Sequence, residues 1–296
     1  MRLSFRSLGI AALVAAAACS DSSSSSGTGP TVTGAAVLSG TISVNRTLAS
    51  DTVYTLSGYV QVASGATLTI PAGTKLIGDT TVAGSSLFIL RGARIVANGS
   101  AAQPIVFTSA RAPGNRKPGD WGGLILVGNA QNNRGGTVIV EGSNGGPGAG
   151  SAGITYNGGS DDADNSGVLR YVRVEFAGYA VAANEELNSF TFAAVGSGTT
   201  MDYLQSMAGL DDSFEWFGGK ADARHLVSYE SGDDHFDTSE GFRGRVQYLI
   251  GLDDGRLQPD QVLHAAAEAL GGVEVVVARL IRDEVLRIGL AAEPFE

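Results

Sequence analysis

One stretch of the sequence is nearly written twice, with an offset of 22 residues. Segments 211–219 and 233–241 each carry two acidic residues, then a phenylalanine, a further acidic residue and a closing glycine at matching positions. A fixed period of this length is typical of solenoids, in which one short unit stacks on the next. The repeat therefore predicts stacked coils, and it aligns carboxylates from successive coils.

A second pattern fixes the phase of these coils. Three leucines lie 22 and 23 residues apart, and each follows a ring-bearing residue: Tyr203-Leu204, His225-Leu226 and Tyr248-Leu249. Tyr171-Val172 has the same form 32 residues before Tyr203-Leu204, which indicates a loop inserted at about 180–188. A sandwich would not keep like residues in register at this period, so the spacing favours a parallel β-helix.

Short apolar runs punctuated by glycine and threonine support an all-β fold. They predict strands at residues 67–70, 87–90, 104–107, 124–127 and 137–140, with no helix between them. We expect this β-helix domain to span residues 31–254.

The first 18 residues form a secretory signal, with Arg2 and Arg6 before an apolar run that is too short to span a membrane. Residues 16–19 resemble the lipobox of bacterial lipoproteins, which implies a lipid anchor on Cys19. Alanine stands at position 16, where that family usually has leucine, and a plain signal peptide is the alternative. Residues 19–30 are rich in Ser and Gly and predict a flexible tether. The resemblance implies the outer membrane, on its periplasmic or surface face.

The charge of the chain limits its partners. Removal of Arg2 and Arg6 with the leader leaves 18 basic and 30 acidic residues, a net charge of −12. This charge argues against nucleic acid as a partner and is compatible with divalent cations. No nucleotide-binding glycine motif is present, no redox cofactor is expected, and the single cysteine allows no internal disulfide.

The last 42 residues, 255–296, break with the repeat. Their glycine and threonine punctuation stops, and apolar residues recur at helical spacing. Either this tail is a helical cap over the open end of the solenoid, or the native last coils have been replaced through a truncation or frameshift.

Three segments, 65–74, 101–109 and 119–124, resemble recurrent segments of secreted bacterial lipoproteins with a right-handed parallel β-helix, a family related in fold to pectin lyases. The resemblance covers about residues 53–254. It implies a right-handed parallel β-helix in a secreted protein. It implies no single activity, because many members of that family have no assigned role.

The repeated carboxylates are candidate metal ligands. Strands of neighbouring coils lie about 4.8 Å apart, so equivalent acidic residues become neighbours. Hard oxygen clusters of this kind suit Ca²⁺. The candidates are Asp212, Glu215, Asp234 and Asp237, with a weaker second patch at Asp161, Asp162 and Asp164. Solvated turn residues are the alternative for both patches.

The same region offers two further kinds of residue. For a catalytic site, Asp212, Asp234 and Asp237 would supply acids, and His235 or Arg243 a base or a substrate clamp. For a ligand site, Trp121 and Trp216 are candidates to stack on sugar rings, with packing in the interior of the coil as the alternative.

Two functions follow from these observations. The first is an outer-membrane-anchored, non-catalytic surface module that binds glycans, with Ca²⁺ as a candidate cofactor. The alternative is a calcium-dependent polysaccharide lyase or glycosidase that acts on an acidic polysaccharide. Gly232-Asp233-Asp234 resembles the Gly-Asp-Asp of polygalacturonases, but the Gly-His-Gly and Arg-Ile-Lys elements that accompany it in that family are missing from this sequence, which favours the first function.

Overall fold

The computed structural model describes residues 31–144, 153–183, 185–253 and 256–257. The predicted signal peptide, the whole tether with Cys19 and nearly all of the tail lie outside the described residues, so the predictions for them remain predictions. The described part of the chain consists of strands, turns and loops. It contains no helix long and apolar enough to cross a membrane.

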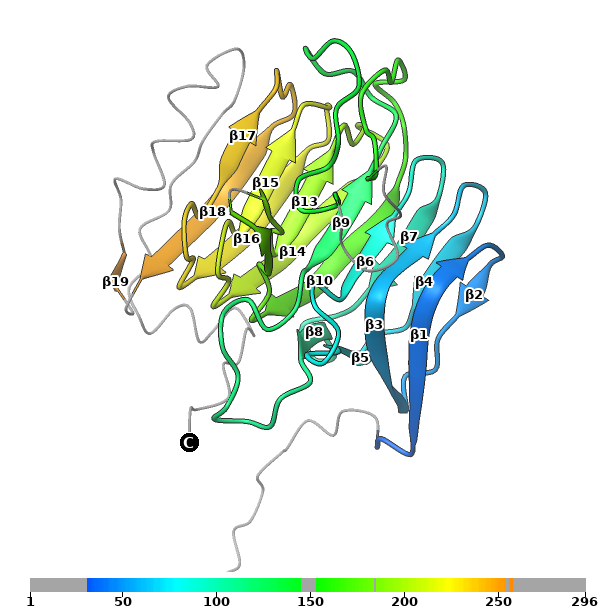
Figure 1. Cartoon of the computed structure of the whole chain (residues 1–296), viewed down its shortest axis with the longest axis vertical. Coiled ribbons are helices and arrows are strands. Elements are labelled where there is room, and N and C mark those ends of the chain that lie inside the picture. The colour runs from blue at the N-terminus through cyan, green and yellow to red at the C-terminus, as the bar shows by residue number, and fades with distance from the viewer. Residues whose placement is uncertain (1–30, 145–152, 184, 254–255, 258–296) are drawn as a thin grey trace, which may run out of the picture.

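The strands form three parallel stacks that wind into a β-helix (Figure 1). Stack 1 holds the first parts of β1 (Gly34–Ile42) and β3 (Thr52–Val62), β5 (Lys75–Gly78), β8 (Ile105–Ser109) and the second halves of β10 (Gly167–Glu175), β14 (Thr200–Met207), β16 (Ala223–Tyr229) and β18 (Val246–Asp253). Stack 2 holds the ends of β1 and β3, β6 (Ser86–Ile89), β9 (Leu124–Val127), β13 (Phe190–Ala193), β15 (Phe214–Phe217) and β17 (Asp237–Ser239). Stack 3 holds β2 (Arg46–Thr47), β4 (Thr67–Ile70), β7 (Arg94–Asn98) and the first halves of β10, β14, β16 and β18. The predicted parallel β-helix is confirmed.

The leucine spacing marks the register of the coils. Leu204 pairs with Leu226, which pairs with Leu249 on the next coil. The ring-bearing residue before each leucine, like Tyr171 before Val172, lies at the corner between stacks 3 and 1. The φ angles of these four residues lie between 48° and 59°. The four rings, Tyr171, Tyr203, His225 and Tyr248, stack with centroids 4.5, 4.4 and 4.8 Å apart. Left-handed backbone is costly for side chains other than glycine, and ring stacking at each corner offsets part of that cost.

Aromatic residues also fill the interior beneath stack 2. Phe214 stacks between Phe190 and Phe236, with centroids 4.9 and 5.4 Å apart. Trp216 lies between Phe192 and Phe242 in the same way. Since side chains alternate along a strand, these residues point inward and Glu215 points outward between them. This aromatic column holds the acidic column in register.

Two insertions cover part of the outer face of stack 2. One comprises the described residues between β9 and β10. The other follows β10 and contains the small hairpin of β11 (Ala180–Ala182) and β12 (Glu185–Glu186), which agrees with the loop expected at 180–188. Val140, Tyr156 and Leu187 from these insertions pack on the outward residues of stack 2 in a second apolar cluster. The predicted strand at 137–140 is wrong: its apolar residues belong to this covering layer, joined to it by the isolated bridge of Ile139 with Thr155.

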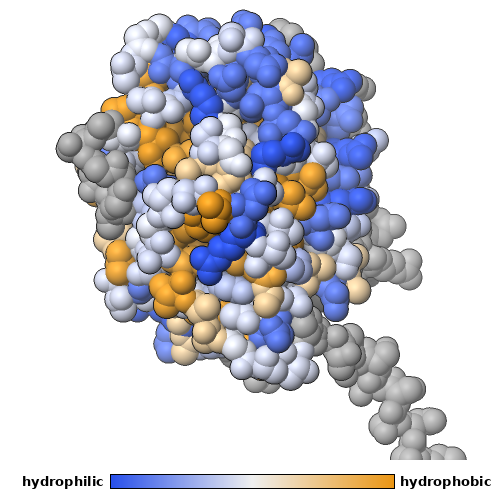
Figure 2. Space-filling model, turned by 90° about the vertical axis from the view of Figure 1, so that its right-hand side faces the viewer, coloured by the Kyte–Doolittle hydropathy of each residue, from blue (hydrophilic) through white to orange (hydrophobic). Residues whose placement is uncertain are grey.

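The remaining elements complete the described end of the solenoid. β19 (Arg256–Leu257) turns back antiparallel on the end of β18. On the face shown in Figure 2, apolar side chains lie in separate areas among polar ones. Exposed large apolar residues among those described are few: Val32, Val37, Val44, Leu210 and Tyr248.

The packing predicts unequal costs for removing two stacked rings. Phe214→Ala should lower the free energy of unfolding by about 3–5 kcal/mol, because Phe214 is fully buried between two rings. Tyr248→Ala should cost about 1 kcal/mol or less, because Tyr248 is 46% exposed and stacks on one ring only among those described. Urea denaturation measures both. Equal losses would contradict the inward column as the main support of the fold.

Candidate functional site

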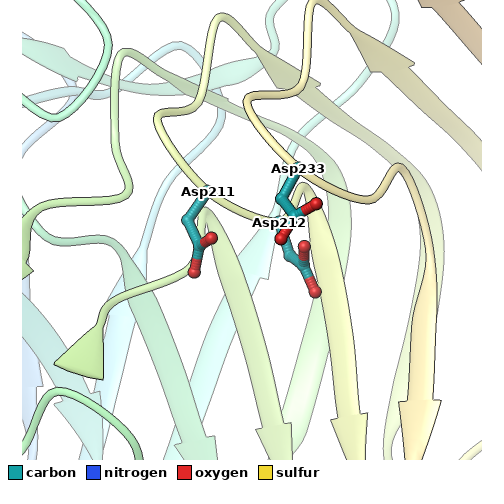
Figure 3. Close-up of side chains that lie close together, drawn as sticks. All are labelled: Asp211, Asp212 and Asp233. Atoms are coloured by element: carbon teal, nitrogen blue, oxygen red, sulfur yellow. The ribbon is translucent and has the colours of Figure 1, made fainter. Parts of the chain in front are cut away.

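The carboxylates of the repeat meet on the outside of stack 2, as the register predicts. Glu215 of β15 pairs directly with Asp237 of β17. Asp212, just before β15, accepts a hydrogen bond at Oδ1 from the backbone N–H of Asp234 over 2.8 Å. A side chain of one coil thus ties down the turn of the next coil. Figure 3 shows Asp211 and Asp212 beside Asp233 of the neighbouring turn.

Two groups of acidic oxygens converge here and share one member. Single oxygens of Asp212, Glu215 and Asp237 lie within 4.8 Å of one another, and so do oxygens of Asp211, Asp212 and Asp233. We call the first group the acidic cluster. Asp234, predicted as a ligand, contributes its backbone N–H to Asp212. In the described part of the chain, no lysine or arginine forms an ion pair with any member of the acidic cluster.

A fourth carboxylate, Glu141, joins the cluster from the insertion between β9 and β10. It is hydrogen-bonded to Glu215, which is in turn hydrogen-bonded to Asp237. The apolar contacts of Val140 with the outer face of stack 2 bring Glu141 to this position. Sequence reasoning missed Glu141, because it lies in an insertion outside the repeat and no spacing connects it to Glu215.

Burial and like charge raise the pKa of these acids. Burial is the main cause for each: it raises the pKa of Asp212 to about 8, of Glu141 to about 7 and of Asp211 to about 6. Burial and the charges of Asp212, Glu141 and Asp237 also hold the pKa of Glu215 well above its usual range. Charged carboxylates in this position repel one another, and a cation would relieve the repulsion.

Asn188 adds an amide to the acidic cluster. Its side chain is buried, 1% exposed, and its Nδ2 donates to Oε2 of Glu215. Its Oδ1 is also buried and has no hydrogen-bond partner among the described residues. A buried acceptor without a donor costs free energy. An amide oxygen beside carboxylates is a usual part of a Ca²⁺ ligand set, so these residues fit that ion.

An open cleft of about 750 Å³ leads to this group. Its lining combines carboxylates with an apolar floor and a few polar side chains: Asn133, Arg134, Val138, Ile139, Glu141, Tyr156, Glu185, Glu215, Phe217, Ser239 and Glu240. Glu240 is held by the Tyr156 hydroxyl, which donates to its Oε2 over 2.5 Å, and by Arg134, whose Nη1 is 3.1 Å from its Oε1. The volume suits a small organic ligand.

His235, a predicted base, is not brought into the cleft. It is 1% exposed, with its Nδ1 2.6 Å from the Ser228 hydroxyl and its Nε2 3.4 Å from Oδ2 of Asp253. Asp253 follows Leu252, which pairs with Tyr229 at the end of stack 1. It therefore belongs to stack 1, whereas Glu215 and Asp237 lie on stack 2, and it does not add a third coil to the acidic repeat.

Arg243, the other predicted base, is engaged elsewhere. Its Nη1 and Nη2 donate to the two carboxylate oxygens of Asp162 over 2.6 Å each. Asp161 accepts a hydrogen bond from the N–H of Ala163. Within the described residues, the patch of Asp161, Asp162 and Asp164 forms no converging group of acidic ligands. Its oxygens stabilise turns and an ion pair, as the alternative interpretation has it.

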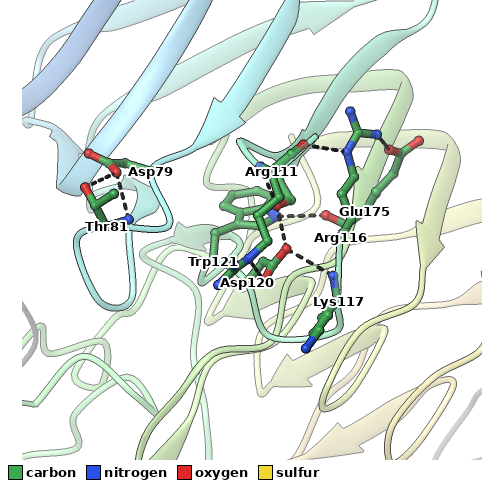
Figure 4. A network of polar contacts seen from close by, with 9 residues as sticks. Asp79, Thr81, Arg111, Arg116, Lys117, Asp120, Trp121 and Glu175 are labelled. Atoms are coloured by element: carbon green, nitrogen blue, oxygen red, sulfur yellow. Dashed lines mark hydrogen bonds and ion pairs between the residues drawn. The ribbon is translucent and has the colours of Figure 1, made fainter. Parts of the chain in front are cut away.

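The prediction that Trp121 and Trp216 contact a ligand is corrected by the structure. Both side chains are buried, at 0% and 1% exposure, and face the core. Trp121 donates from Nε1 to the carbonyl oxygen of Glu175 over 2.7 Å and stacks with Phe107, beside the ion pairs of Asp120 and Glu175 (Figure 4). Phe217, one residue after Trp216, is the aromatic residue that lines the cleft.

The fold and the cleft define a parallel β-helix with an acidic site on its outer face. The profile of one family, the pectate-lyase-like beta helix domain, matches residues 40–261. The chain belongs to this family, which makes it a carbohydrate-related β-helix module. No curated protein and no solved structure matches the chain.

The raised pKa values predict how stability depends on pH. The folded state holds protons on Asp212 and Glu141 that the unfolded state has released above about pH 4.5. Stability therefore falls as the pH rises from about 5 to about 8. Asp212→Asn removes this contribution and should raise the free energy of unfolding by about 1–2 kcal/mol at pH 8, and by little at pH 5.

Urea denaturation of both proteins at several pH values, with chelator present, measures the effect. The difference between the two proteins isolates Asp212 from His235, whose lowered pKa acts in the opposite direction. A difference that does not grow with pH would contradict the raised pKa of Asp212.

Proposed function

We propose that this protein is a lipid-anchored glycan-binding module of the outer membrane and that the acidic cleft is its binding site. Family membership supports a carbohydrate ligand. The observation that carries the proposal is the cleft itself: carboxylates that lack basic partners lie beside Phe217 and the hydroxyl and amide groups that suit sugar recognition. The anchor rests on the sequence around Cys19.

Calcium is the cofactor that we propose for the acidic cluster. Asp212, Glu215, Asp237 and Oδ1 of Asn188 supply four oxygens of the kind that Ca²⁺ prefers. A bound cation would neutralise the mutual repulsion of the carboxylates and give the buried amide oxygen a partner. Ca²⁺ at this position would stiffen the floor of the cleft.

The geometry supports binding over cleavage. Glycosidases hold their two carboxyl groups about 5–9.5 Å apart, whereas Glu141 and Glu215 are hydrogen-bonded to each other. A lyase needs a base beside the substrate. Of the bases expected from the sequence, His235 is buried and Arg243 is bound to Asp162. Arg134, which lines the cleft, is paired with Glu240.

Calcium binding is tested by thermal unfolding with excess Ca²⁺ and with chelator. Ca²⁺ at about 100 times its Kd should stabilise the protein by about 2.7 kcal/mol, a shift of several degrees in Tm. The double variant Asp212→Asn with Asp237→Asn should lose the shift. Asp161→Asn, in the patch that does not converge, should keep it. A shift that survives the double variant would place the ion elsewhere.

Binding without cleavage is tested with the same preparations. In affinity electrophoresis, the migration of the wild type should be retarded by a gel that contains its polysaccharide ligand. Incubation with that polysaccharide should release neither reducing ends nor unsaturated products. Products that vanish in Glu215→Gln would establish the lyase or glycosidase alternative instead.

The anchor is tested by cell fractionation. Cys19→Ser should move the protein from the membrane pellet to the soluble fraction, because it removes the thiol to which the lipid would be attached. An unchanged distribution would contradict lipidation at Cys19.

A further inference from the structure

The cleft is unevenly charged along its length. Four carboxylates line it, from Glu141, Glu185, Glu215 and Glu240, against one guanidinium, that of Arg134. Arg134 is already paired with Glu240. The end of the cleft at Glu141, Glu185 and Glu215 therefore has no basic partner among the described residues. An anionic group of a ligand would find no basic side chain there among the described residues.

The same end of the cleft offers carboxyl groups and no basic side chain among the described residues. Glu141, Glu185 and Glu215 line it, and Asn188, which is 1% exposed, lies behind Glu215 and donates to it from Nδ2. Once these carboxyl groups release the protons that burial and repulsion hold on them, they are acceptors only. A ligand group that takes the place of those protons brings positive charge and several N–H donors, which is the chemistry of a protonated amine.

The rest of the cleft suits a ring with an apolar face and hydroxyl groups. Phe217 is half-buried, its ring 5.9 Å from that of Tyr156, and it lies in the floor with Val138 and Ile139. Asn133 and Ser239 line the same space. An aromatic floor with polar side chains around it is the usual arrangement for a sugar ring, and it favours a sugar over a basic peptide.

We propose that the cleft binds an amino sugar with a free ammonium group, so that the glycan ligand is cationic. The ammonium group contacts Glu141, Glu185 and Glu215 from the open side of the cleft, and the ring lies over Phe217. This inference rests on the proposed glycan-binding function and names the class of glycan. The acidic surface of the mature chain, with its net charge of −12, attracts such a polymer from solution. Ca²⁺ in the acidic cluster shares Glu215 with the ammonium group, so the two compete.

The test compares four ligands by titration calorimetry of the mature chain at neutral pH with chelator present: a glucosamine tetramer, its N-acetylated form, tetragalacturonate and tetralysine. The glucosamine tetramer should bind, and N-acetylation should weaken binding about 10-fold or more, because it removes the charge and two of the donors. Glu141→Gln should weaken binding of the glucosamine tetramer by a similar factor. Asp51→Asn, in the turn just before β3 and outside the lining of the cleft, should leave it unchanged. Added Ca²⁺ should reduce the affinity.

The outcomes separate this inference from the function on which it rests. Equal binding of the two glucosamine forms would overturn the ammonium site and leave glycan binding in place. Binding of tetragalacturonate with added Ca²⁺, and none of glucosamine, would do the same and establish a calcium-bridged acidic glycan. Tetralysine binding as tight as that of glucosamine would replace the sugar with a basic peptide. No binding of any glycan would overturn both.

The Tm of Glu141→Gln shows whether weaker binding by this variant is caused by misfolding. The amide keeps the shape of the carboxyl group and removes a repulsive charge, so Tm in chelator should stay the same or rise. A variant that binds weakly and melts earlier than the wild type would show that Glu141 supports the fold, and the inference would be overturned.

Discussion

The parallel backbone pairing between coils determines which side chains of this molecule lie next to one another. Because Leu204, Leu226 and Leu249 lie one above another, each residue of a coil meets its equivalent on the next. Like residues are forced into contact whatever their chemistry. For apolar and aromatic residues this is favourable, and the column of Phe190, Phe214 and Phe236 is the result. For acidic residues the same register is unfavourable by itself.

The outer face of stack 2 carries that unfavourable contact. Glu215 stands over Asp237 because Phe214 stacks on Phe236 one position earlier, so the inward column holds the outward one together. The two insertions then cover part of this face, which excludes water and strengthens the repulsion. Protons on the carboxyl groups relieve it when no ligand is bound. A cation bound by Asp212, Glu215 and Asp237 would also relieve it.

Much of this arrangement could be predicted from the sequence, and the limits have physical causes. The repeat predicted the coils, their register and the contacts of Asp212, Glu215 and Asp237, because parallel pairing converts spacing directly into proximity. The inward position of Trp216 also follows from the sequence, because side chains alternate along a strand and its neighbour Glu215 faces outward. Glu141 and Asn188 could not be predicted as parts of the site. Both reach it through the covering insertions, whose course depends on tertiary packing and on no period.

The central claim is that the buried carboxyl groups around Glu215 form the binding site of a positively charged group. Diffraction from crystals of the mature protein, grown once with the glucosamine tetramer and once with Ca²⁺, tests it most directly. The account predicts density for an ammonium group in contact with Glu215 in the first crystal, and for an ion in contact with Glu215 in the second. Glu215 bonded only to Glu141, Asp237 and Asn188, with ligand absent from the cleft in both crystals, would contradict it.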